Sequence, residues 1–236
     1  MECEVVAEIA SMFGWETHLG HLTSGGTMAN MEALWVSSRI KLGKAIAASD
    51  QAHYTHGRIS KVLQIPFAPI ASDAEGRMDM AALEAALQTG DIGTIVATLG
   101  TTAIGTTDPL PEILVLAKRY DCQVHVDAAY GGYFTLTDNL PPQTRNTFAR
   151  IGDADSIVID PHKHGLQPYG CGCILFRDPT VGAYYKHDSP YTYFTSAKLH
   201  LGEISLECSR AGAAAVALWA TQQALPLTKS GVLPPT

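Results

Sequence analysis

The chain has 236 residues, of which 46% are apolar and 17% are charged, and this is enough apolar material for one large hydrophobic core. Its formal net charge of -7, without any basic run, argues against a nucleic-acid-binding surface. The longest apolar block, 213–220, is much shorter than the ~20 residues of a membrane span, and the amino terminus is acidic where a signal peptide would be basic. We therefore expect a globular, cytoplasmic protein.

The pattern of apolar residues predicts alternating helices and strands. Helices are expected over 4–13, 28–40, 80–87, 109–120 and 206–225, with a further helix after His53. Short apolar runs predict strands over 45–49, 94–99, 122–126, 156–159 and 172–176. Pro66 and Pro69 indicate a connecting segment, and 184–200 has no clear period, which indicates a long loop. This α/β alternation is typical of a mostly parallel sheet between helices.

The segment DSIVIDPHKHG, from Asp155 to Gly165, contains the residue that is most informative about function. Its apolar run 156–159 predicts a buried strand, so Lys163 is expected on a loop at the carboxyl end of that strand. Ligands bind at this end of the strands in α/β sheets. A partly desolvated lysine there can lose its proton and form a Schiff base with a carbonyl compound. The simpler alternative is a solvated loop lysine.

Three further segments place polar groups at the ends of predicted elements. Gly25, Gly26 and Thr27 lead into a helix, where free backbone amides and a hydroxyl can hold a phosphate. His53 follows one predicted strand and Asp127 follows another. Each also has a simpler interpretation, because such residues commonly form capped turns, begin helices or cap them.

Together, these four groups match the needs of one cofactor, pyridoxal 5'-phosphate. Its phosphate requires amides and hydroxyls, its ring a stacking partner, its pyridine nitrogen a carboxylate, and its aldehyde a lysine. The combination therefore favours a pyridoxal-phosphate enzyme over the separate simple interpretations.

The remaining reactive residues do not suggest a metal or a disulfide framework. Nine histidines include three close pairs, but none has the paired spacing of a zinc site, so no metal is expected. The five cysteines are odd in number and lie in apolar surroundings, which predicts reduced and buried thiols.

Several motifs resemble the group II pyridoxal-phosphate-dependent amino acid decarboxylases, which include glutamate, tyrosine and aromatic amino acid decarboxylases. The matching segments are TSGGTMAN, SDQAHYTH, ATLGTTAIGTTDP, VHVDAAYGG and DSIVIDPHKHG, in the order of the family, between about residues 19 and 210. The resemblance implies the large domain of fold type I, the aspartate-aminotransferase-like fold. It also implies decarboxylation of an aromatic or acidic L-amino acid to its amine.

The resemblance assigns a role to each matching residue. It implies that Lys163 forms the Schiff base, that Asp127 holds the pyridine nitrogen and that His53 stacks on the cofactor ring. Ala129 would contact the opposite ring face, Thr101 the ring substituents, and Gly25, Gly26, Thr27 and His162 the phosphate. In the family, a tyrosine on a mobile loop about thirty residues beyond the lysine commonly protonates the α-carbon. Tyr191 is the candidate here, ahead of Tyr193, although it could instead be an aromatic residue packed under a loop.

The chain departs from the family pattern in its length. Family members have an additional amino-terminal segment and a carboxyl-terminal small domain, so we expect an incomplete large domain over 1–225 and a tail over 226–236. Two alternatives remain open: another fold type I enzyme, such as an aminotransferase or a desulfurase, and a cofactor-binding remnant without turnover. The resemblance also implies a homodimer whose sites are completed across the interface, with the loop 184–200 as the contributing segment.

Overall fold

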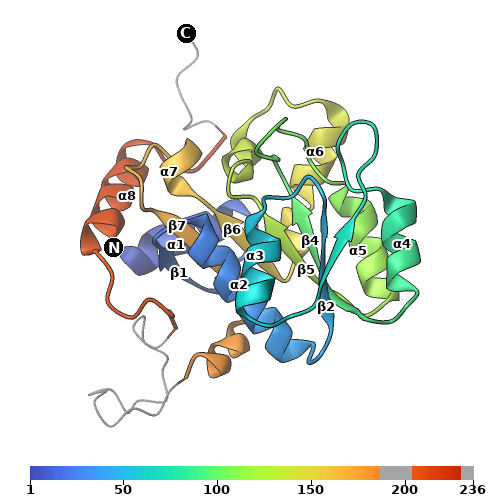
Figure 1. Cartoon of the computed structure of the whole chain (residues 1–236). Coiled ribbons are helices and arrows are strands. Elements are labelled where there is room, and N and C mark those ends of the chain that lie inside the picture. Colours follow the sequence, from blue (N-terminus) through green and yellow to red (C-terminus); the bar gives the residue numbers. More distant parts are fainter. Residues whose placement is uncertain (187–203, 230–236) are drawn as a thin grey trace.

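The computed structural model describes residues 1–186 and 204–229, and the described residues form a seven-stranded sheet with helices on both faces (Figure 1). This confirms the predicted α/β class. The strands are β1 (Leu19–Thr23), β2 (Ala45–Ser49), β3 (Phe67–Ile70), β4 (Ile92–Thr98), β5 (Gln123–Asp127), β6 (Ser156–Ile159) and β7 (Gly172–Phe176).

The strand order is β1-β7-β6-β5-β4-β2-β3. β3, β2, β4, β5 and β6 pair in parallel, whereas β7 is antiparallel to both β6 and β1. In the pairing of β5 with β6, Asp127 lies opposite Val158. Because parallel strands end at the same edge of a sheet, the residues that follow β2, β4, β5 and β6 lie along one edge, where α/β folds bind ligands.

The described chain also contains eight helices and three short 3-10 helices. The helices are α1 (Glu2–Met12), α2 (Gly26–Ile40), α3 (Thr55–Val62), α4 (Met80–Leu87), α5 (Leu110–Arg119), α6 (Pro142–Ala149), α7 (Pro161–His164) and α8 (Gly212–Ala224), and the 3-10 helices are η1 (Gly132–Leu136), η2 (Ile151–Asp153) and η3 (Pro179–Tyr184). Within residues 1–186 and 204–229, every helix is too short or too polar to cross a bilayer.

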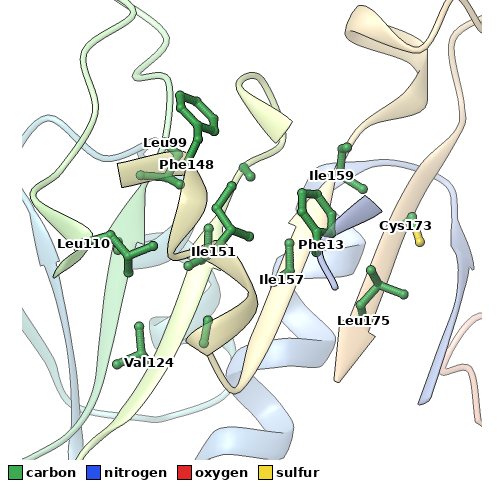
Figure 2. Close-up of a cluster of buried hydrophobic side chains, with 14 of the residues drawn as sticks. Phe13, Leu99, Leu110, Val124, Phe148, Ile151, Ile157, Ile159, Cys173 and Leu175 are labelled. Carbon is green, nitrogen blue, oxygen red and sulfur yellow. The ribbon is translucent and has the colours of Figure 1, made fainter. Parts of the chain in front are cut away.

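The two faces of the sheet are covered by different helices. A large apolar cluster on one face contains side chains from α1, α4, α5, α6 and α8, and Figure 2 shows Phe13, Ile151 and Ile157 within it. Two smaller clusters pack α2 and α3 against the opposite face. Because side chains alternate along a strand, Val124 and Val126 of β5 enter the large cluster, and His125 and Asp127 point to the α2 and α3 side.

The structure adds two strands to the prediction. β3 contains Pro69, where a connecting segment was expected, and it lies at the edge of the sheet, where a missing backbone donor is tolerated. β1 was not predicted either, because the glycine and the histidine interrupt the apolar pattern of its short sequence LGHLT. Both strands form because a neighbouring strand offers the pairing edge, which the local sequence does not reveal.

Three local predictions were wrong. Lys163 lies within the short helix α7, which Pro161 begins, and not on a loop. α8 begins at Gly212 and not at 206. In the segment just before it, the Glu207 carboxylate accepts a hydrogen bond from the backbone amide of Ser24, and Arg210 forms an ion pair with Glu2, and these contacts keep that segment out of the helix. The cysteines carry free thiols, but Cys3 and Cys208 are exposed rather than buried.

Candidate active site

A cavity of about 320 Å³ opens at the edge of the sheet where the parallel strands end. It brings together most of the predicted site residues from well-separated parts of the chain, and these are Gly25, Gly26, Thr27, His53, Asp127, Ala129, His162 and Lys163. The convergence follows from the parallel pairing of the strands that precede these residues.

Lys163 is paired with a carboxylate that the sequence interpretation did not include. Its Nζ lies 3.1 Å from Oδ2 of Asp160, whose side chain is 3% exposed, whereas that of Lys163 is 37% exposed. Burial raises the pKa of Asp160, and the nearby Lys163 and His162 partly offset this increase. The position of Asp160, one helical turn before the lysine in DPHK, is a signal that could have indicated the pairing.

Asp127 is a buried carboxylate with donors on both oxygens. Its Oδ2 lies 2.9 Å from Nε2 of His56, and its Oδ1 accepts a hydrogen bond of 3.1 Å from the backbone amide of Ala129. Burial opposes ionisation of this carboxyl, but the hydrogen bond and charge of His56, with smaller contributions from His125 and Ala129, more than compensate and hold its pKa well below the usual range. Asp127 therefore provides a fixed negative charge in the wall of the cavity.

His53 is held in one orientation by its immediate neighbours. Its Nδ1 lies 2.7 Å from Oγ1 of Thr55 and accepts a hydrogen bond of 3.3 Å from the Thr55 backbone amide. The ring also packs on Tyr54, with centroids 4.4 Å apart and planes inclined by 32°. Burial lowers the pKa of His53, so the ring is predominantly neutral near neutral pH, with its proton on Nε2 because Nδ1 is an acceptor.

The start of α2 lies next to these side chains. Among the described residues, no side chain caps this helix, so the amides of its first turn remain available to an anion. A Cβ atom on Gly26 would lie 2.7 Å from Oδ2 of Asp160, and therefore only glycine fits there without displacing the carboxylate. Nδ1 of His162 lies 2.8 Å from the carbonyl oxygen of Cys171, which fixes a second polar ring near the helix start.

A buried network joins α2 to the strand that carries Asp127. Nδ1 and Nε2 of His125 lie 2.8 Å from Oγ of Ser156 and 2.8 Å from Oδ1 of Asn30, whose amide nitrogen donates to the carbonyl oxygen of Gly26 at 2.8 Å. Burial chiefly lowers the pKa of His125 to about 3, so this ring stays neutral. The alternation of apolar and polar residues in VHVD could have indicated that both polar residues share a face.

One predicted residue does not line the cavity, and another lies outside the described residues. Thr101 is buried and its hydroxyl accepts a hydrogen bond of 3.1 Å from the backbone amide of Thr106, while Gly100 and Thr102 line the cavity instead. Tyr191 lies outside the described residues, as does Tyr193. The roles of both residues therefore stay predictions.

The side chains at this cavity fit pyridoxal 5'-phosphate. They provide an amine, a fixed carboxylate, an imidazole ring and a helix start with free amides, within a volume typical of small-molecule sites. Oδ1 of Asp160 is buried and unpartnered within the described chain, which leaves a polar atom for a ligand to satisfy. In that same part of the chain, no three His, Cys, Asp or Glu side chains are grouped to hold a metal ion.

Comparison with known proteins identifies a matching domain and several relatives. The model of the pyridoxal-dependent decarboxylase conserved domain matches residues 1–225. An aspartate 1-decarboxylase of Aliivibrio fischeri is 32% identical over 228 residues, covering 83% of this chain and 41% of the relative. An L-tyrosine/L-aspartate decarboxylase of Methanocaldococcus jannaschii is 34% identical over 218 residues, covering 86% of this chain and 54% of the relative.

A solved structure shows the same fold. The crystal structure of mouse CSAD superimposes with a TM-score of 0.85 at 24% sequence identity, covering 96% of this chain and 51% of that chain. The chain thus spans about half the length of the proteins that it matches.

Proposed function

Because the chain belongs to the pyridoxal-dependent decarboxylase family, we propose that its cavity carries out the decarboxylation of an L-amino acid to the amine and carbon dioxide. The cofactor of this family is pyridoxal 5'-phosphate. The observation that carries the proposal is the convergence of Lys163, Asp127 and His53 on one cavity at the edge of a parallel sheet. We also propose that residues 1–225 form the large domain of the protein.

Each side chain would contribute a distinct function. When bound, the cofactor supplies the electron sink that accepts the electron pair left behind by carbon dioxide. Lys163 would hold its aldehyde, and Asp127 would keep a proton on its pyridine nitrogen, since a buried carboxylate with a lowered pKa remains charged. His53 would pack against the ring, and the first turn of α2 with His162 would hold the phosphate.

The substrate is proposed to be an aromatic or acidic L-amino acid. The relatives described above are named for aspartate and for tyrosine and aspartate. In this chain, Tyr54, Tyr130 and Tyr169 line the cavity and are 66%, 40% and 92% exposed. Their exposed ring surfaces could contact an aromatic substrate side chain, and the ring N–H groups of the imidazoles could donate hydrogen bonds to a carboxylate.

We further propose that the protein acts as a homodimer and that Tyr191 protonates the α-carbon. The exposed apolar side chains of Ile104 and Leu166, 60% and 70% exposed, would be covered by a second subunit. Light scattering at micromolar concentration, with and without the cofactor, tests the assembly. A catalytically active monomer would contradict this part of the proposal.

The decisive experiment identifies the lysine that holds the cofactor. Protein loaded with pyridoxal 5'-phosphate is reduced with borohydride, digested and analysed by mass spectrometry, and a pyridoxyl group is expected on Lys163. Lys163→Ala should abolish the adduct, whereas Lys61→Ala, which changes a lysine of α3 away from the cavity, should retain it. An adduct on another lysine would refute the site.

Turnover is measured separately. Release of carbon dioxide from carboxyl-labelled amino acids, including tyrosine and aspartate, should occur with the unmodified protein and disappear with Lys163→Ala. Cofactor binding without release from any substrate would refute the catalytic proposal while leaving the cofactor site intact.

A further inference from the structure

His56, which the sequence interpretation did not assign, makes direct contact with the proposed cofactor carboxylate. It lies in α3, one helical turn after His53, and its side chain is 1% exposed. We propose that His56 is a positioning residue that fixes the carboxylate of Asp127 for the pyridine nitrogen of the cofactor. This inference rests on the proposed function.

The first argument is geometric. The two donors to Asp127 come from different elements, with Nε2 of His56 at 2.9 Å from Oδ2 and the amide of Ala129 at 3.1 Å from Oδ1. Because each oxygen accepts one hydrogen bond, the carboxylate cannot rotate without losing one of them. Each oxygen retains a lone pair that can accept a hydrogen bond from a ligand in the cavity.

The second argument concerns the histidine itself. A carboxylate can only accept, so Nε2 of His56 carries the donated proton. In the described part of the chain, Nδ1 of His56 is buried without a hydrogen-bond partner, and its ring packs edge-on against His125, with centroids 6.5 Å apart. The polar contact of this side chain is therefore directed at Asp127, which indicates a role at the site rather than in a wider structural network.

A second histidine–carboxylate pair provides a matched control. Nε2 of His21, in β1, lies 2.9 Å from Oε2 of Glu32, in α2, and both side chains are fully buried. Neither residue lines the cavity at the sheet edge. The same substitution can thus be made in two buried pairs with the same 2.9 Å separation, one hydrogen-bonded at the site and one without hydrogen-bond geometry outside it.

The experiment compares His56→Met, His56→Gln and His21→Met by titration with pyridoxal 5'-phosphate. Met and Gln have similar length, but only Gln can donate a hydrogen bond to Asp127. We expect His56→Met to raise the Kd for the cofactor by about 10- to 100-fold, because Asp127 loses a buried donor. His56→Gln should remain within about threefold of the unmodified protein, and His21→Met should lower the Tm without changing the Kd.

The spectrum and a measurement on the unmodified protein complete the test. The absorption band of the ring-protonated cofactor should weaken in His56→Met and be restored in His56→Gln. Nitrogen NMR of the unmodified protein should show that adding the cofactor shifts the His56 ring signals and leaves those of His21 unchanged, which decides the question even if His56→Met does not fold.

The outcomes distinguish this inference from the proposed function. Unmodified protein that binds no cofactor overturns both. If the cofactor binds on Lys163 and His56→Met leaves its affinity and spectrum unaltered, only the role of His56 is overturned. The same holds if His56→Met and His21→Met lose affinity equally. Failure of His56→Gln to restore the spectrum has the same consequence.

Discussion

The two faces of the central sheet differ in the kind of side chain that they bury. On one face, Val124 and Val126 of β5 and Ile157 of β6 join a continuous apolar cluster. On the other face, the same strand β5 buries His125 and Asp127, which contact polar side chains of α2 and α3. One face therefore buries a continuous apolar cluster, and the other combines two smaller apolar clusters with charged and polar groups in fixed positions next to the cavity.

This difference shows how one region of a fold can accommodate buried polar groups whose burial is energetically unfavourable. Buried polar groups cost free energy unless every one is paired, whereas buried apolar groups contribute directly to stability. The apolar face contributes the stability that allows the other face to bury polar groups whose role is at the cavity. Substitutions on the two faces should consequently separate stability from cofactor binding.

The largest expected loss of stability comes from the apolar face. Ile157→Ala removes a fully buried side chain and should lower the free energy of unfolding by about 2–5 kcal/mol. The folded fraction should still bind the cofactor with nearly unchanged Kd, because the side chain points away from the site face. Urea unfolding and cofactor titration of the same sample measure the two quantities, and equal damage to both would contradict the separation of the faces.

Asp127→Asn should reduce activity strongly and stability only slightly, the reverse of Ile157→Ala. An amide is a weaker partner for a protonated pyridine nitrogen, so the rate of carbon dioxide release should fall by about 100-fold or more, while some cofactor remains bound. The melting temperature should change less than in Ile157→Ala. A variant that turns over almost normally would exclude the proposed role of this carboxylate.

Asp108 is a buried carboxylate that serves the fold and not the cavity. Its Oδ1 accepts from the amide of Met78 at 2.7 Å and its Oδ2 from the amide of Thr98 at 2.8 Å, and burial raises its pKa to about 6 despite these donors. In Asp108→Asn, the side-chain NH₂ faces a backbone donor, which should cost about 1–3 kcal/mol of stability. Calorimetry should detect this loss, whereas a raised cofactor Kd per folded molecule would show that Asp108 also supports the site.

The polar face should also make stability depend on pH, and the change for each pH unit should be smaller than the losses expected for the substitutions above. The pKa of His125 is lowered from 6.5 to about 3 in the folded state, so between these values the unfolded chain binds a proton that the folded chain does not. The contribution of His125 to the free energy of unfolding should therefore fall as the pH decreases from about 6.5 towards about 3, by up to about 1.4 kcal/mol per pH unit, while Asp108, with its raised pKa, contributes in the opposite direction.

A variant isolates this contribution. His125→Asn removes the titrating ring, so the slope of stability against pH should be shallower than in the unmodified protein in urea unfolding series. His53 also has a lowered pKa and contributes in the same direction, which is why the difference between the two proteins is the informative quantity. Identical slopes would show that His125 is not buried in its neutral form.

Much of the architecture could be predicted from local pattern. The strands 45–49, 156–159 and 172–176 and the helix 80–87 have the predicted bounds, because their apolar runs and flanking residues define both ends. The placement of Lys163, Asp127 and His53 at one edge also followed from the sequence, since parallel strands end together, Asp127 ends β5, and His53 and Lys163 come shortly after β2 and β6.

The sequence by itself determined the fold class and the placement of Lys163, Asp127 and His53 at the carboxyl ends of strands. The tertiary structure alone decided the partners of those side chains, namely Asp160 beside Lys163 and His56 on Asp127, and placed Thr102 rather than Thr101 at the cavity. It also decided the edge strand β3 and the beginning of α8. The reason is physical: apolar period and strand ends are local properties, whereas a hydrogen bond between α3 and β5 depends on how two distant segments meet across a buried interface.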